Sequence, residues 1–143
     1  VHTDLQGAVN DATVLASAFR SIGVDLPDNH FLTNSSATLA NFLAAWSNVT
    51  QQAQPGDRVF VTYAGHGGQE REVSEPLDEA DGLDETLMFH DFNPDHPREG
   101  RLNDDQLRAM LETDLLTASM SSIGVLEKKE TSPFVVINNW ALD

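Results

Sequence analysis

The sequence predicts an α/β fold in which a mostly parallel sheet is covered by helices on both faces. Two observations lead to this prediction. Apolar residues recur at three- and four-residue spacing in three separate segments, as in amphipathic helices. Short apolar runs typical of buried strands alternate with those segments. No internal repeat or linker interrupts the 143 residues, so we expect a single domain, 1–143.

The first part of the chain is predicted to hold two helices and a short strand. The first helix covers residues 5–22 and ends at Gly23, because glycine suits the left-handed position after a helix. Residues 30–33 form a short strand or extended stretch. Ser35 or Ser36 caps the second helix. Its apolar face consists of Leu39, Phe42, Leu43, Trp46 and Val49.

The middle of the chain is predicted to alternate strands with long loops. Residues 58–63 are largely apolar, which indicates a central strand. Residues 65–83 are polar and rich in glycine and acidic residues, and a loop of this length is usually functional or disordered. A second strand follows at residues 86–89, and a second loop at residues 92–100.

The last part of the chain is predicted to begin with a helix and to end with a strand. Asn103 caps the helix, and Gln106 at the third helical position completes a capping box. Residues 134–137 are the last strand candidate. Residues 117–132 fit least well, since they show no clear period and form a longer connection than such units need.

The composition limits the possible partners. Eight basic residues against 23 acidic residues give a formal charge of −15, which argues against nucleic acid or an anionic membrane as a partner. The charge suits a divalent cation, a basic substrate or simple solubility. No apolar run is long enough for a transmembrane helix. The chain shows no signal peptide and no initiator Met, so we expect an excerpt of unknown localisation, with the cytoplasm slightly favoured.

A histidine flanked by glycines is the most informative feature of the chain. The segment Gly65-His66-Gly67-Gly68 directly follows the predicted strand at residues 58–63. His66 is a candidate general acid or base, because the unperturbed pKa of histidine as a residue type lies near neutrality. The Gly67 N–H is a candidate donor to an oxyanion. The alternative is a turn in which the histidine is only a surface residue.

Acidic residues gather in a second constellation. A run at residues 78–85 holds five acids in eight positions, and Asp91, Asp104 and Asp105 follow it. Carboxylates brought close together repel one another, and a hard cation such as Ca²⁺ relieves that repulsion. The alternatives are a solvated loop and acids that stabilise the first turn of a helix.

One further acid lies near the start of the first helix. Asp11 has apolar neighbours at Val9 and Ala12, and in that place it is a candidate floor of a pocket for a basic group. The alternative is an exposed helix acid.

These segments together resemble the caspase-like cysteine peptidases, and within them the metacaspase and bacterial caspase-family branch. Their order and spacing match the large-subunit half of that family over about residues 4–112, whereas the tail at residues 113–143 diverges. The matching stretches are residues 5–12 (LQGAVNDA), 55–57 (PGD), 59–69 (VFVTYAGHGGQ), 78–87 (DEADGLDETL) and 102–107 (LNDDQL).

The resemblance implies a three-layer α/β sandwich around a mostly parallel sheet, here incomplete at both ends, and a Cys–His dyad that cleaves after Arg or Lys. His66 corresponds to the dyad histidine and Gly67 to the oxyanion-hole amide. Asp11 falls where the family keeps an acid for the basic side chain of the substrate. The acids that bind activating Ca²⁺ in metacaspases correspond to Asp84, Asp104 and Asp105.

The chain departs from the family because it contains no cysteine. The position expected for the nucleophile falls on Trp140, unless the chain stops just short of it at Asp143 or the reading frame changes after about Leu111. Without a thiolate no acyl-enzyme forms. We therefore expect a portion of a caspase-like cysteine endopeptidase that is inactive alone, and that acts on basic peptides or proteins when completed.

Two rival interpretations follow from the same absence. The first is a non-catalytic pseudo-peptidase that serves as a calcium- or partner-binding module. The second is an acidic α/β domain whose motifs are remnants.

Overall fold

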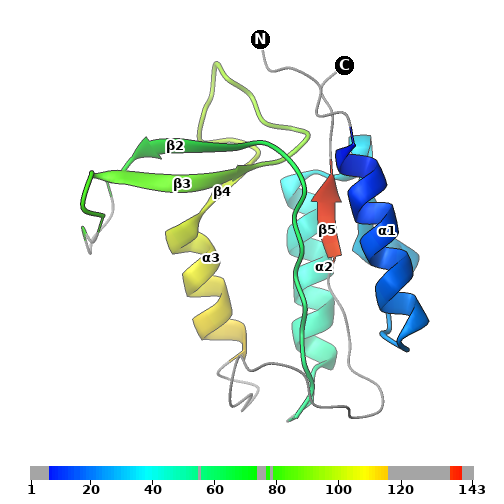
Figure 1. Ribbon diagram of the computed structural model, residues 1–143. Coiled ribbons are helices and arrows are strands. Elements are labelled where there is room, and N and C mark those ends of the chain that lie inside the picture. The colour runs from blue at the N-terminus through cyan, green and yellow to red at the C-terminus, as the bar shows by residue number, and fades with distance from the viewer. Residues whose placement is uncertain (1–6, 55, 74–76, 78, 116–135, 140–143) are drawn as a thin grey trace.

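A computed structural model of the chain describes residues 7–54, 56–73, 77, 79–115 and 136–139 (Figure 1). The predictions for Trp140, for residues 117–132 and for the start of the last strand at residues 134–135 lie outside these residues. In chain order the elements are α1 (Ala8–Ser21), η1 (Asp28–His30), β1 (Phe31–Thr33), η2 (Asn34–Ser36), α2 (Leu39–Gln52), β2 (Gly67–Arg71), β3 (Leu83–Met88), β4 (Arg101–Asn103), α3 (Asp104–Met110), the π-helical turn η3 (Leu111–Leu115) and β5 (Val136–Asn139).

The three predicted helices are confirmed, and so is the end of the first. Gly23 follows α1 with a φ of 84°, a left-handed conformation that glycine adopts without strain. The predicted cap of α2 was wrong. Thr38 caps this helix, since its side chain accepts the N–H of Asn41 at 3.2 Å. Ser35 and Ser36 belong instead to the short 3-10 turn η2.

Extended chain lies between α1 and α2 and gives the molecule a layered arrangement. In β1, Phe31 packs against the α1 side and the next residue, Leu32, packs against the α2 side. The segment at residues 58–63 repeats this alternation, with Val59 toward α2 and Phe60 toward α1. Alternate side chains of extended backbone point to opposite faces, so both segments form a middle layer between the two helices.

The predicted central strand at residues 58–63 was wrong as a hydrogen-bonded strand. The segment runs extended past α2 in Figure 1, but it is not part of a β-ladder. Its side-chain alternation therefore reflects packing between two helices rather than sheet pairing. The parallel pairing described is that of β1 with β5, and the described residues do not show a mostly parallel central sheet.

A three-stranded antiparallel sheet forms the other part of the molecule, in the order β2-β3-β4. Of the strand predicted at residues 86–89, residues 86–88 are confirmed as the end of β3, although the neighbours of β3 are antiparallel. The long loop predicted over residues 65–83 was wrong in part, because Gly67–Arg71 forms β2. α3 follows β4 directly, and the predicted capping box is present, with Asn103 and Gln106 hydrogen-bonded to each other's backbone N–H.

The larger apolar core joins the antiparallel sheet to α2. Phe89 is 1% exposed and lies 5.3 Å from the ring of Phe42, measured between centroids. The ring of Tyr63 meets Phe89 edge-on at 6.3 Å, which ties the histidine segment to this core. None of the helices in the described residues combines the length and apolarity that a membrane-spanning helix needs.

Candidate functional site

The backbone of His66 is held at the junction of the extended segment with β2. Its carbonyl oxygen accepts the N–H of Met88 at 2.9 Å and lies 2.6 Å from the hydroxyl oxygen of Tyr63. That hydroxyl is also 2.6 Å from the carbonyl oxygen of Met88. Its single proton can therefore be donated to either of these two carbonyl oxygens. The half-buried His66 is thereby fixed to β3 through its main chain.

Gly65 is required by the way the chain wraps around Tyr63. A Cβ atom at this position would lie 2.5 Å from the phenol oxygen and 2.6 Å from the ring carbon that carries it. Those distances are far inside van der Waals contact. The glycine before His66 therefore serves the close approach of backbone to the ring, a role that the sequence pattern did not reveal.

The N–H of Gly67 points away from the sheet. Hydrogen-bonded and non-bonded pairs alternate along an antiparallel ladder. The N–H of Met88 bonds the carbonyl oxygen of His66 at 2.9 Å, and the N–H of Glu72 bonds that of Gly82 at 3.0 Å. In the observed register the pair Gly67–Leu87 is therefore a non-bonded one. A backbone donor directed away from the ladder, next to His66, is what an oxyanion site requires.

Asp11 lies in the first turn of α1, and its side chain is exposed. Its neighbour Ala12 is buried against the smaller core cluster, which places Asp11 at the border of a packed face. The exposed position alone does not make a pocket floor, and the role of Asp11 in recognising a basic side chain stays a prediction.

Asp84 is buried in the antiparallel sheet, with 2% of its surface exposed. Its Oδ2 accepts a hydrogen bond of 2.7 Å from the side-chain amide of Asn103, the residue that caps α3. Asp84 thus joins β3 to the start of α3. The other predicted metal ligands, Asp104 and Asp105, follow this cap directly.

One of the predicted acids meets two others in space. Glu79, Glu85 and Asp104 each offer a carboxylate oxygen, and these oxygens lie within 4.8 Å of one another. The Oδ1 of Asp104 is buried without a hydrogen-bond partner. Because Ca²⁺–oxygen distances are about 2.3–2.6 Å, oxygens at this separation can share one ion. The residues therefore fit a hard cation, with Asp104 as the ligand shared with the sequence-based prediction.

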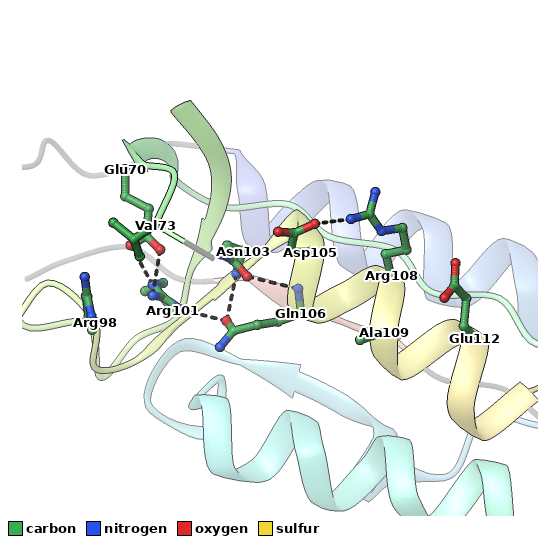
Figure 2. Close-up of a pocket in the computed structure, with 10 residues that line it drawn as sticks. All are labelled: Glu70, Val73, Arg98, Arg101, Asn103, Asp105, Gln106, Arg108, Ala109 and Glu112. Carbon is green, nitrogen blue, oxygen red and sulfur yellow. Dashed lines mark hydrogen bonds and ion pairs between the residues drawn. The ribbon is translucent and has the colours of Figure 1, made fainter. Parts of the chain in front are cut away.

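Asp105 belongs to a neighbouring polar cavity of about 590 Å³ between β2, β4 and α3 (Figure 2). There it pairs with Arg108. Arg101 holds the carboxylate of Glu70 through two hydrogen bonds of 2.9 and 2.7 Å, and it donates a third of 2.6 Å to Gln106. Basic and acidic groups thus balance around the cavity, which stabilises the sheet that carries His66.

Comparison with known proteins connects this geometry to a family. A family model described as "Metacaspase, peptidase C14 domain" matches residues 2–123. The chain belongs to the metacaspase family. The resemblance inferred from the motifs is therefore confirmed. Metacaspases are caspase-like cysteine peptidases, so the family acts on proteins or peptides.

Similar metacaspases come from several fungi. Metacaspase-1 of Mycosarcoma maydis is 34% identical over 114 residues, which cover 76% of this chain and 27% of that protein. Metacaspase-1 of Schizosaccharomyces pombe is 30% identical over 115 residues, covering 76% and 26%. Metacaspase-1 of Ajellomyces capsulatus is 34% identical over 119 residues, covering 78% and 32%. The chain thus spans between about a quarter and a third of these relatives. No solved structure matches it.

Three residues of this candidate site were not among the site residues predicted from the sequence. Glu79 and Glu85 lie in the acidic run at residues 78–85, but only the pairing of β2 with β3 and of β3 with β4 brings them to Asp104. Tyr63 looked like one more apolar strand residue. Its position three residues before His66 was the signal available, because a side chain at that spacing can fold back onto the turn.

Proposed function

We propose that this chain supplies the histidine part of a cysteine endopeptidase site that cleaves after arginine or lysine. The observation that carries the proposal is the outward-pointing N–H of Gly67 beside His66. A thiolate attacks the scissile carbonyl carbon, and the developing oxyanion accepts the Gly67 N–H. The His66 imidazolium then gives its proton to the leaving amine as the carbon–nitrogen bond breaks.

The specificity part of the proposal rests on charge. A net charge of −15 favours basic substrates, and Asp11 corresponds to the acid that the family uses for a basic side chain. Because the 143 residues contain no cysteine, the nucleophile has to come from sequence outside this chain. The chain alone is expected to form no acyl-enzyme.

The test compares the chain with the longer product of its source transcript, once a cysteine-coding segment is identified there. Fluorogenic peptides carry arginine, lysine or aspartate before the scissile bond. We expect no turnover by the chain alone and cleavage after arginine and lysine by the longer product. His66→Ala should abolish cleavage, and Asp11→Asn should raise KM for basic peptides more than the exposed control Asp25→Asn. Cleavage after aspartate alone would refute the proposed specificity.

The absence of cysteine also favours a second candidate, a pseudo-peptidase that binds a partner without cleaving it. This candidate gains support if the source transcript encodes no cysteine downstream of Asp143. It then predicts that basic peptides bind the chain and remain intact.

We further propose that Glu79, Glu85 and Asp104 bind Ca²⁺. The buried, unpaired Oδ1 of Asp104 supports this proposal, since a cation would satisfy it. Binding to the folded state alone stabilises it by about 2.7 kcal/mol at a Ca²⁺ concentration of 100 times Kd. Thermal unfolding with CaCl₂, and with MgCl₂ for comparison, measures this effect.

Two matched variants decide which acids hold the ion. Glu85→Gln removes a charge from the proposed group, whereas Asp105→Asn removes one from the neighbouring ion pair with Arg108. We expect the first to weaken Ca²⁺-dependent stabilisation strongly and the second to leave it nearly unchanged. The reverse result would favour the set predicted from sequence, and an unchanged Tm in millimolar Ca²⁺ would exclude the site.

A further inference from the structure

We infer that the outer edge of β2 binds an extended, basic peptide segment by strand addition, starting at Gly67. That this segment is the part of the substrate next to the scissile bond rests on the proposed function. The binding itself does not, because it requires only the backbone of Gly67–Arg71 and the exposure of that edge.

The hydrogen-bond pattern sets which backbone groups face outward. Since His66 and Glu72 both lie in bonded pairs with the β3 side, the bonded positions of β2 between them are the even-numbered ones. The N–H and C=O groups of Gly67, Gln69 and Arg71 therefore point to the outer edge. They recur every second residue, which is the spacing that an added strand requires.

The pairing of β3 with β4 independently indicates that the backbone groups of Gly67 point away from β3. The N–H of Phe89 bonds the carbonyl oxygen of Gly100 at 2.8 Å. In the register of β3 with β4, the bonded pair two residues away is Leu87 with Leu102. Leu87 thus directs its backbone groups to β4 and offers none to Gly67, which lies opposite it on β2.

The edge is accessible and held in place. β2 is the terminal strand of its three-stranded sheet, as Figure 1 shows, and Gly67, Gln69 and Arg71 are exposed. Gly67 and Gly68 carry no side chains that would obstruct an approaching backbone. Glu70 fixes β2 to β4, since its carboxylate accepts two hydrogen bonds from the buried Arg101 (Figure 2). Five residues of strand span about 17 Å, enough for a peptide of similar length.

Charge selects a basic peptide over a second copy of the chain. Exposed strand edges also pair with one another. Two copies that each carry a formal charge of −15 repel, whereas a peptide with a net positive charge is attracted. The edge starts beside His66, so a peptide on it leads directly to the proposed oxyanion donor.

The test measures amide signals and amide hydrogen exchange of the ¹⁵N-labelled chain. In the free chain, the amides at positions 67, 69 and 71 should exchange faster than those at 68 and 70. The probe is an acetylated and amidated hexapeptide of alternating valine and threonine with one central arginine. We expect it to shift the three outward amides and to slow their exchange. Equal protection of odd and even positions in the free chain would overturn the inference.

A matched pair of variants tests the outward donor directly. Gln69→Pro removes an N–H that takes no part in the β3 ladder, and proline is tolerated at such edge positions. Gln69→Ala keeps that N–H but loses the same side-chain bond to Glu85. We expect the proline variant to raise Kd about tenfold, as for one lost main-chain hydrogen bond, and the alanine variant to change it less than about twofold.

A modified peptide covers the case in which the proline variant fails to fold. N-methylation of alternate peptide nitrogens in either register removes the donors that strand addition needs, so one of the two methylated peptides should lose binding to the unmodified chain. Binding that survives both methylations would overturn the inference. Protection of the edge amides that rises with protein concentration in the absence of peptide would also overturn it, because it indicates a second copy of the chain.

If an aspartate-containing hexapeptide binds equally well, the basic preference of the edge fails. Lack of cleavage by the completed protein would instead count against the proposed function, while the edge contacts persist.

Discussion

Replacement of Asn103 should separate two contributions to stability that meet in one side chain. The Asn103 side chain is 2.7 Å from Asp84 Oδ2, and it also accepts the N–H of Gln106 at 3.0 Å as the cap of α3. Asn103→Ala removes both interactions. Loss of an N-cap costs about 1 kcal/mol, and loss of a hydrogen bond to a charged group costs about 1.5–3 kcal/mol. Asp84 is 2% exposed, so water cannot replace the lost amide. We therefore expect Asn103→Ala to lower the free energy of unfolding by about 3 kcal/mol in total.

Asn103→Ser isolates the second contribution. Serine is as good an N-cap as asparagine, but its shorter side chain does not reach Asp84, so we expect a loss of about 2 kcal/mol. In an Asp84→Ala background, Asn103→Ala should cost only the cap, about 1 kcal/mol. Urea denaturation at neutral pH measures the free energy of unfolding of each variant. Equal losses for the alanine and serine variants, or additive losses in the double variant, would refute the proposed coupling.

Two further changes test the support of the histidine segment and the polar cavity. Gly65→Ala should destabilise the chain by about 1–3 kcal/mol through overpacking against Tyr63, and by less in a Tyr63→Ala background; an equal loss in both would show that the ring is not the obstacle. Arg101→Met should cost about 3 kcal/mol because it leaves Glu70 unpaired, whereas the double change with Glu70→Leu should recover most of that loss in urea denaturation. Additive losses would contradict the ion pair as the cause.

The helices could be predicted because their signals are local. Gly23 ends α1, and Asn103 with Gln106 starts α3, through contacts within a few residues of chain. Such contacts form in the same way whatever surrounds them. The predicted positions of the glycine and of the capping box were therefore confirmed residue by residue.

The strands were harder because a ladder depends on a distant partner. The apolar residues 58–63 look like a central strand, yet they join no ladder, and Val59 packs toward α2 while Phe60 packs toward α1. The polar Gly67–Arg71 looks like a loop, yet it pairs with β3 and is anchored through Glu70 to Arg101, 31 residues away. Neither outcome follows from local propensity.

The candidate site shows the same division. His66 and Gly67 form a recognisable motif because they are adjacent in sequence. The acidic group could be predicted only in part, since Glu79 and Glu85 reach Asp104 through strand register and not through spacing along the chain. A sequence shows that acids are abundant, whereas the sheet decides which of them share a point in space.

Tyr63 is the only tyrosine among the 143 residues, and its hydroxyl lies against the carbonyl oxygen of His66. Selective isotope labelling of tyrosine would therefore produce a single ring signature without any engineered probe. That signature would monitor the backbone beneath the histidine while calcium, peptide or denaturant is added. The residue that steadies the turn is thus also a built-in spectroscopic reporter of its conformation.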